Sequence, residues 1–228
     1  MSKKPLEKAA KSDRDHAMRV YRALEKAWPE ATCELTWKEP HELLVATILS
    51  AQSTDVAVNR ATPALFKAFP TVDAFAEAEP ADIEPLIATI GLFRNKSKSV
   101  VESMRRVRDE YGGEVPQTME SLVTLRGVAR KTANVVLGNA FNVNEGVVVD
   151  THVMRLAWRL GLTEHERKTD RIERDLMARF PKPRWTMLSH LLVFHGRYAC
   201  KARHATCGEH PVCKRYAKAG RCTCDGAP

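Results

Sequence analysis

Apolar residues recur at helical spacing along almost the whole chain, and this pattern most constrains the fold. Residues 17, 21, 24 and 28 form one such stripe, and residues 41–52 (HELLVATILSAQ) are apolar almost all round. An α-helix repeats every 3.6 residues, so these stripes mark helices that pack against a core. Strand patterns are weak, and prolines and glycines interrupt the stripes at short intervals. The sequence therefore predicts an all-α fold with many helices and short loops.

Length and charge narrow the class of protein further. The chain has 228 residues, enough for one large or two small domains, and a net charge of +8. A basic balance suits a polyanionic partner. No stretch approaches the roughly 20 apolar residues of a membrane span. We therefore expect a cytoplasmic protein without a membrane partner, nucleoid-associated if bacterial. Residues 1–13 are expected to form a disordered basic arm. This arm is either a solubilising tail or an additional DNA-binding segment.

Residues 120–140 predict two short helices joined by a tight turn. The turn is formed by Arg126, Gly127 and Val128, and the second helix starts near Ala129. Gly127 allows the positive φ that such a turn often needs. The first N–H groups of the second helix lack intrahelical partners and lie at the positive end of its dipole. This start suits an anion, such as a phosphate of a nucleic-acid backbone.

Two cations, Arg130 and Lys131, occupy the first turn of that helix, the unfavourable end for stability. The helix dipole and the neighbouring arginine both favour a neutral Lys131 amine, which is the nucleophilic form. Asp150 follows nineteen residues later, directly after three valines. Folding can bring Asp150 beside Lys131, but spacing alone does not establish it. The alternative is a solvated or phosphate-contacting Lys131, with Asp150 capping the next helix.

Two further segments contain candidate DNA-contacting residues. Gln52 lies in a polar cluster after a core helix, and its amide can fill the gap left by an extruded base. The alternative is ordinary capping by this cluster. Leu92 lies in a loop. Its side chain is either an apolar wedge that enters between base steps of DNA or a residue that packs within the loop. Lys96 and Lys98, near that wedge, are candidate phosphate contacts.

Five of the six cysteines lie between residues 200 and 224. Thiolates gathered in one loop bind Zn²⁺ or an iron–sulfur cluster. His204 and His210 lie among them, which makes zinc a serious alternative. Cys33 is remote in sequence and is expected to be a buried apolar side chain.

The segments LRGVARKTANVVL (125–137), VVDTH (148–152), ILSAQSTD (48–55) and IGL (90–92) resemble motifs of the endonuclease III family of DNA glycosylases, within the helix-hairpin-helix superfamily. The resemblance implies that Lys131 attacks the sugar and Asp150 assists. It implies a DNA-binding set of Gln52, Leu92, Arg126, Gly127, Ala129 and Arg130. Arg126 stands where the family usually has proline, adding a charge where DNA would pass, and Ala129 stands where it usually has glycine.

The resemblance also implies a [4Fe–4S] cluster, which four cysteines hold in this family. Cys200 and Cys207 match the first two ligand positions. His210 stands where the third cysteine is expected, so Cys213 and Cys222 align as third and fourth ligands after longer gaps. His210 and Cys224 are alternatives for completing the set.

Taken together, the resemblance implies two helical domains flanking a DNA cleft. One is a six-helix barrel with the helix-hairpin-helix (residues 33–144), and the other a discontinuous iron–sulfur domain (14–32 and 145–228). The implied function is a monomeric bifunctional glycosylase and abasic-site lyase acting on double-stranded DNA with damaged pyrimidines or abasic sites. It removes oxidised pyrimidines through a Schiff base and cuts 3′ to the lesion by β-elimination. The alternatives are a non-catalytic or weakly active DNA-binding protein and a monofunctional mismatch glycosylase.

Overall fold

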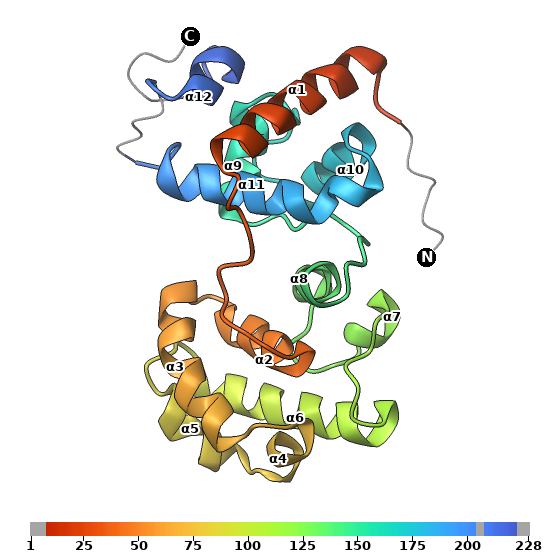
Figure 1. The fold of residues 1–228 in the computed structure, drawn as a ribbon, viewed down its shortest axis with the longest axis vertical. Helices are drawn as coiled ribbons and strands as arrows, with labels where there is room; N and C mark the ends of the chain where they lie inside the picture. Colours follow the sequence, from red (N-terminus) through yellow and green to blue (C-terminus); the bar gives the residue numbers. More distant parts are fainter. Residues whose placement is uncertain (1–7, 204–207, 223–228) are drawn as a thin grey trace. The chain divides into compact units, whose positions relative to one another are not determined.

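The computed structural model describes residues 8–203 and 208–222, and every regular element in these residues is a helix (Figure 1). The all-α fold expected from the sequence is therefore confirmed. The chain divides into two compact units. Unit 1 comprises Met1–Thr32 and Gly146–Pro228, and unit 2 comprises Cys33–Glu145. None of the described helices has the length and apolar character needed to cross a membrane.

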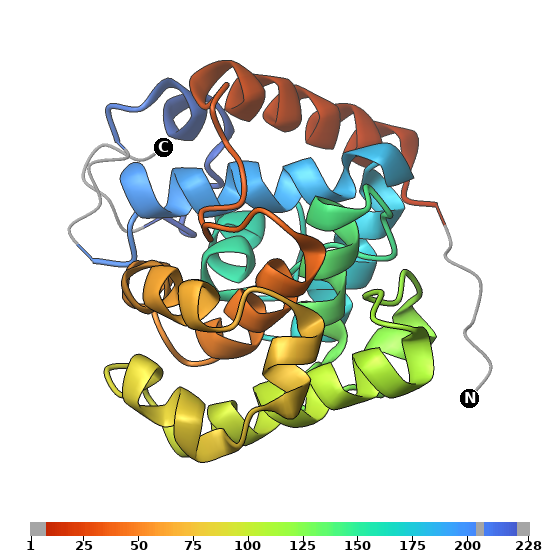
Figure 2. The same cartoon turned by 60° about the horizontal axis from the view of Figure 1, so that its bottom comes forward.

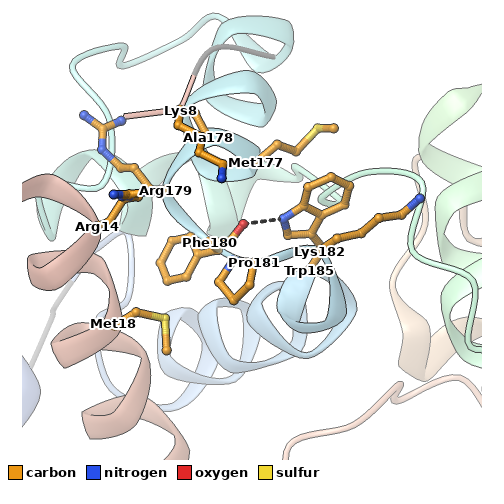
Figure 3. Close-up of a pocket in the computed structure, with 10 residues that line it drawn as sticks. All are labelled: Lys8, Arg14, Met18, Met177, Ala178, Arg179, Phe180, Pro181, Lys182 and Trp185. Atoms are coloured by element: carbon orange, nitrogen blue, oxygen red, sulfur yellow. Dashed lines mark hydrogen bonds between the residues drawn. The ribbon is translucent and has the colours of Figure 1, made fainter. Parts of the chain in front are cut away.

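Unit 2 is built around α2, whose buried residues form the centre of its core. Its helices are α2 (Pro40–Ser50), α3 (Asp55–Ala68), α4 (Val72–Glu77), α5 (Pro80–Ile87), α6 (Phe93–Tyr111), α7 (Met119–Leu122) and α8 (Arg130–Ala140). Helix α2 contacts α3, α6 and α8, while α4 and α5 pack on α6 (Figure 2). The apolar character of α2 on nearly all sides follows from these neighbours, because a helix enclosed by others has no polar face.

Local signals explain where several helices of unit 2 begin. The hydroxyl groups of Thr54, Thr71 and Thr118 accept backbone N–H bonds at the starts of α3, α4 and α7. Capping boxes combined with a following proline open α2 and α5. The first N–H groups of a helix have no carbonyl acceptor within the helix. Because these caps supply acceptors for them, each helix begins at a defined residue.

Unit 1 joins the N-terminal helix to the C-terminal part of the chain through one core. Its helices are α1 (Lys11–Ala27), α9 (Thr151–Arg159), α10 (Thr169–Arg179), the short 3₁₀ helix η1 (Lys182–Arg184), α11 (Trp185–Tyr198) and α12 (Pro211–Tyr216). Helix α11 contacts both α1 and α9 (Figure 1). Leu24, Leu156 and Leu188 are fully buried in this core, so the helices from the two ends of the chain depend on each other.

The start of α1 differs from the expected limit of the N-terminal arm. The helix begins at Lys11, inside the residues expected to be disordered, while residues 1–7 lie outside the described part of the chain. Asp13 lies in the first turn, where a carboxylate favours the helix dipole, and pairs with Arg179 at 3.6 Å. The Ala9 N–H also donates to the Ala178 carbonyl at 3.3 Å. These contacts hold the beginning of the helix against α10.

Candidate functional site

The hairpin between α7 and α8 has the tight turn that its sequence predicts. Gly127 has a φ of 79°, a left-handed conformation that glycine adopts without strain. The Val128 N–H donates to the Leu125 carbonyl at 3.2 Å. A Cβ on Gly127 would lie 3.1 Å from the Cβ of Ser99 on α6. Glycine therefore serves twice here, because it provides the backbone conformation and allows the turn to approach α6 closely.

Helix α8 begins without a side-chain cap. Its N-cap residue, Ala129, is exposed and has no side-chain acceptor for the first-turn N–H groups. An uncapped helix start presents N–H donors and the positive end of the dipole to an external acceptor. The geometry at Ala129 therefore fits the phosphate-binding turn that the sequence predicts.

The basic residues around this turn differ in their surroundings. Lys131 is exposed at the second residue of α8. Arg130 instead donates from Nη2 to the Glu145 carbonyl at 3.0 Å, which holds the segment after α8. Arg126 pairs with Glu102 on α6 at 2.5 Å, and this bond lowers the pKa of the Glu102 carboxyl group. The extra charge of Arg126 is thus balanced by an acid that sequence reasoning did not anticipate.

Gln52 and Leu92 lie on two neighbouring turns of unit 2. Both are exposed and have positive φ, 55° and 61°, and Asn142 is the only other non-glycine residue of the described chain with positive φ. A Cβ on Gly91 would lie 4.0 Å from the Gln52 carbonyl oxygen. Leu92, which is 56% exposed, is the N-cap residue of α6. The structure therefore brings together two residues that are 40 positions apart.

The prediction that Lys96 contacts a phosphate is wrong. Lys96 is only 5% exposed. The Nζ atom donates to the Leu49 carbonyl and to Ser53 Oγ, each at 2.8 Å, and burial lowers the pKa of Lys96. Lys98, two residues later, is exposed. Sequence reasoning missed the burial of Lys96 because its acceptors lie on a segment more than 40 residues away.

Asp150 lies in unit 1 at the start of α9, and the expectation that it caps this helix is confirmed. Its Oδ1 accepts the Val153 N–H at 2.8 Å. The segment before it is anchored by the buried Val147 and by the Val148 N–H, which donates to Ser189 Oγ at 3.0 Å. The half-buried carboxyl group is thus fixed by both the helix it starts and the segment that precedes it.

Three of the expected cluster ligands gather in unit 1. Cys200 and Cys213 are buried, and hydrogen bonds from Cys213, Arg159 and Cys222 lower the pKa of the Cys200 thiol to about 6. The same bond to Cys200, together with burial, raises the pKa of Cys213. Cys207 lies outside the described residues, as do His204 and Cys224. Within the described residues, no set of three or more side chains forms a completed metal site.

Two side chains outside residues 200–224, which we call the cysteine loop, donate to these sulfurs. Arg159 of α9, 6% exposed, donates from Nη1 to Cys200 Sγ at 3.1 Å. His195 of α11 places Nε2 3.1 Å from Cys213 Sγ, while the Trp28 indole N–H donates to its Nδ1 at 3.2 Å. An indole N–H only donates, so Nδ1 is the acceptor and Nε2 carries the proton. Burial lowers the pKa of His195 to about 3, which keeps the ring neutral.

His210, one alternative ligand, has other partners in the structure. Its Nδ1 accepts the Val212 N–H at 3.3 Å as the cap of α12. Its ring stacks on Trp28 with centroids 5.8 Å apart and planes 7° apart. Arg159 and His195 are the sulfur donors that the cysteine pattern did not predict. The sequence does not predict that a buried arginine contacts these cysteines. Helical periodicity predicts which face of a helix is buried, but it does not predict which residue a side chain on that face will contact.

Comparison with known proteins yields one consistent group of relatives. Residues 45–182 match the family model described as HhH-GPD superfamily base excision DNA repair protein. Endonuclease III of Synechocystis sp. is 52% identical over 87% of this chain and 90% of its own length. Endonuclease III of Bacillus subtilis is 42% identical over 81% and 84%. A solved structure of a trapped endonuclease III–DNA covalent intermediate, 37% identical, superimposes with a TM-score of 0.84 over 90% of this chain and 95% of its own.

Proposed function

The chain belongs to the HhH-GPD superfamily of base excision DNA repair proteins, and we propose that Lys131 and Asp150 carry its reaction. The protein is a DNA glycosylase with abasic-site lyase activity. One observation supports Lys131 as the nucleophile. This residue is exposed in the first turn of α8, a helix that has no side-chain cap and that follows the turn at Gly127. A phosphate bound at this helix start would place the sugar backbone beside the lysine.

The reaction begins with attack by the neutral amine of Lys131 on C1′ of the nucleotide. The N–C1′ bond forms as the bond from C1′ to the base breaks, and the departing base takes a proton from water. Asp150 accepts the proton that the lysine nitrogen loses, or stabilises the developing positive charge. The C1′–O4′ bond then breaks as the nitrogen forms a double bond to C1′, and O4′ takes a proton from water, which leaves a Schiff base. Loss of a C2′ proton then breaks the C3′–O3′ bond, which cuts the strand 3′ to the lesion.

Asp150 is suited to this role by the way its carboxyl group is held. Capping of α9 engages Oδ1 and fixes the orientation of the group. A general base is effective only when its geometry is set before the reaction. Capping and catalysis are therefore compatible functions of the same side chain.

The proposed substrate is duplex DNA that contains an oxidised pyrimidine or an abasic site. An enzyme acting on C1′ must expose its nucleotide by extruding it from the stack. Leu92 would enter the stack as an apolar wedge, and Gln52 would hydrogen bond in the vacated space. Gly127, Ala129 and Arg130 would form the phosphate-binding turn, with Arg126 beside it paired to Glu102. We infer that a monomer carries out the reaction.

The cysteine loop is proposed to hold a [4Fe–4S] cluster through Cys200, Cys207, Cys213 and Cys222. The described cysteines fit a thiolate-bound group, since two buried sulfurs each receive an N–H bond that stabilises negative charge. When bound, the cluster would supply a structural crosslink for the loop. Lys201, Lys214 and Arg215 lie between the ligands and would be presented to phosphates by that loop. Zinc is the competing occupant.

Borohydride trapping tests the nucleophile directly. A duplex with an abasic site or a thymine glycol is incubated with the protein and borohydride, which reduces a Schiff base to a stable adduct. We expect the wild type to form the adduct and Lys131→Ala to form none, with strand scission reduced at least about 10³-fold. Lys67→Ala, which removes an exposed lysine from α3, is the charge-matched control and should behave as wild type.

Three outcomes of this experiment contradict the proposal in different ways. An adduct that persists in Lys131→Ala would assign the nucleophile to another amine. Base release by the wild type without any adduct would indicate a monofunctional glycosylase. Binding of the duplex without base release, adduct or scission would indicate a non-catalytic DNA-binding protein.

A further inference from the structure

Two exposed residues of unit 2 are held in a backbone conformation that their side chains disfavour. Gln52 and Leu92 have φ values of 55° and 61°. A non-glycine residue seldom adopts this left-handed region, and it persists there only when surrounding structure holds it. The two turns also lie close together, since a Cβ on Gly91 would lie 3.9 Å from Ser53 Oγ. Some part of the structure must therefore hold both turns together.

Lys96 contacts both turns. Its backbone N–H donates to the Leu92 carbonyl at 3.0 Å. Its side chain crosses to the other turn and donates to the Leu49 carbonyl and to Ser53 Oγ, each at 2.8 Å. These acceptors flank Gln52 on both sides in the sequence. One residue thus joins the start of α6 to the end of α2 and to the turn that follows it.

The chemistry of the contact favours a specific role over ordinary packing. Burying a lysine is unfavourable unless its donors are satisfied, and both acceptors here are uncharged oxygens. Burial lowers the pKa of Lys96, which agrees with the uncharged character of the two acceptors of its Nζ atom. The Leu49 carbonyl lies in the last turn of α2, where helix carbonyls lack intrahelical partners and a cation is favourable. An apolar side chain would fill the same volume without joining the turns.

We propose that Lys96 is a positioning residue that holds the Gln52 and Leu92 turns together in the conformation required for insertion into DNA. This inference rests on the roles proposed above for Gln52 and Leu92. Because the turns are set before DNA arrives, the extruded state needs no further ordering of the protein. We call the Lys96 contacts with the two turns the clamp. Loss of the clamp should impair the steps that require insertion of Gln52 and Leu92 into DNA, and it should spare the chemistry of Lys131.

The test compares duplex and single-stranded substrates in the full-length protein. Insertion is followed by the fluorescence of 2-aminopurine placed opposite a tetrahydrofuran abasic analogue in a duplex. We expect Lys96→Met to reduce the amplitude at saturating protein and to slow cleavage of a duplex abasic site by about 10- to 100-fold. Cleavage of a single-stranded abasic oligonucleotide, which needs no extrusion, should remain within about twofold of wild type.

Matched variants separate the clamp from charge and from folding. Lys67→Met loses the same charge from an exposed site at the far end of α3, about 20 Å along the helix from Thr54, and should resemble wild type. Ser53→Ala removes one acceptor and leaves the Leu49 carbonyl, so we expect a smaller loss with the same preference for duplex DNA. This second variant keeps the test valid if Lys96→Met does not fold.

The outcomes distinguish this inference from the function on which it rests. If Leu92→Ala and Gln52→Ala abolish the fluorescence change but folded Lys96→Met and Ser53→Ala retain it, the clamp is overturned alone. Equal losses on duplex and single-stranded DNA would likewise overturn it, because they would indicate a general structural effect. If Leu92→Ala and Gln52→Ala retain the full change, the proposed insertion roles fail instead.

Discussion

In unit 2, backbone conformation fixes the residues that are proposed to contact DNA. In unit 1, hydrogen bonds from other side chains fix the sulfur atoms. Gln52, Leu92 and Gly127 in unit 2 all have positive φ and are exposed. Cys200 and Cys213 in unit 1 are buried, and their sulfurs receive hydrogen bonds from side chains of α9 and α11, respectively. The two regions therefore differ in what a single substitution can disturb.

This difference predicts how closely function and stability are coupled in each unit. An exposed side chain on a fixed turn can be removed at little cost to folding, so its loss should affect DNA chemistry alone. A buried thiol or histidine supports the core as well as the site, so its loss should affect both. Asp150 is the exception in unit 1, because its half-buried carboxyl group combines capping with the proposed chemistry.

The largest effect is expected from Asp150→Asn, which separates the two roles of this residue. Asparagine caps a helix about as well as aspartate but cannot accept a proton. We expect glycosylase turnover to fall by about 10²- to 10⁴-fold with little change in Tm. Asp150→Ala should show the same loss of turnover and a further loss of about 1 kcal/mol in stability. Wild-type turnover in Asp150→Asn would mean that the residue serves only as a cap.

Cys200→Ser tests whether the thiols of unit 1 bind iron and support the fold. We expect loss of bound iron and of the visible absorbance of an iron–sulfur cluster, with a loss of about 3 kcal/mol in stability, or about 10 °C in Tm. Cys33→Ser, in unit 2, is the matched control and should keep wild-type iron content. Iron and zinc are measured by elemental analysis. Bound zinc in place of iron in the wild type would refute the cluster.

Gly127→Ala tests the backbone-based site of unit 2. Alanine is strained at a φ of 79°, and its Cβ would lie 3.1 Å from the Ser99 Cβ. We expect a loss of about 2 kcal/mol in stability and weaker binding to an abasic-analogue duplex, measured by denaturation and fluorescence anisotropy. Gly112→Ala, at a φ of 63° with nothing within 4 Å, should cost about 1 kcal/mol and leave DNA binding unchanged. Equal effects of the two variants on binding would exclude a specific role for the turn.

The smallest effect is expected from the titration of a histidine in unit 1. Burial lowers the pKa of His190 on α11 to about 4, below the ordinary histidine value of 6.5. Below pH 6.5 the unfolded chain therefore binds a proton that the folded chain does not, and stability falls as pH drops from 6.5 toward 4. The slope from this group is at most about 1.4 kcal/mol per pH unit. Hydrogen exchange of α11 should show this dependence, and His190→Gln should reduce it. An unchanged slope in His190→Gln would assign the acid sensitivity to other groups.

Much of the site could be predicted from the sequence because its signals are local. The turn at Gly127 and the cap at Asp150 each depend on a few neighbouring residues, and the structure confirms both. The prediction for Lys96 failed for the opposite reason. Its position near Leu92 indicated a phosphate contact, but its two acceptors come from the end of α2 and from the turn that follows it, 47 and 43 residues away in the sequence.

The sequence by itself determined the helical class, the motif that contains Lys131 and the gathering of cysteines near the C-terminus. These properties follow from helical periodicity, glycine conformation and residue spacing, which act within one segment. Only the tertiary structure decided that Lys96 is buried, that Arg126 pairs with Glu102, and that Arg159 and His195 donate to sulfur. Each of these contacts joins residues at least 18 positions apart in the sequence, and periodicity within a helix specifies the face of a residue but not its partner.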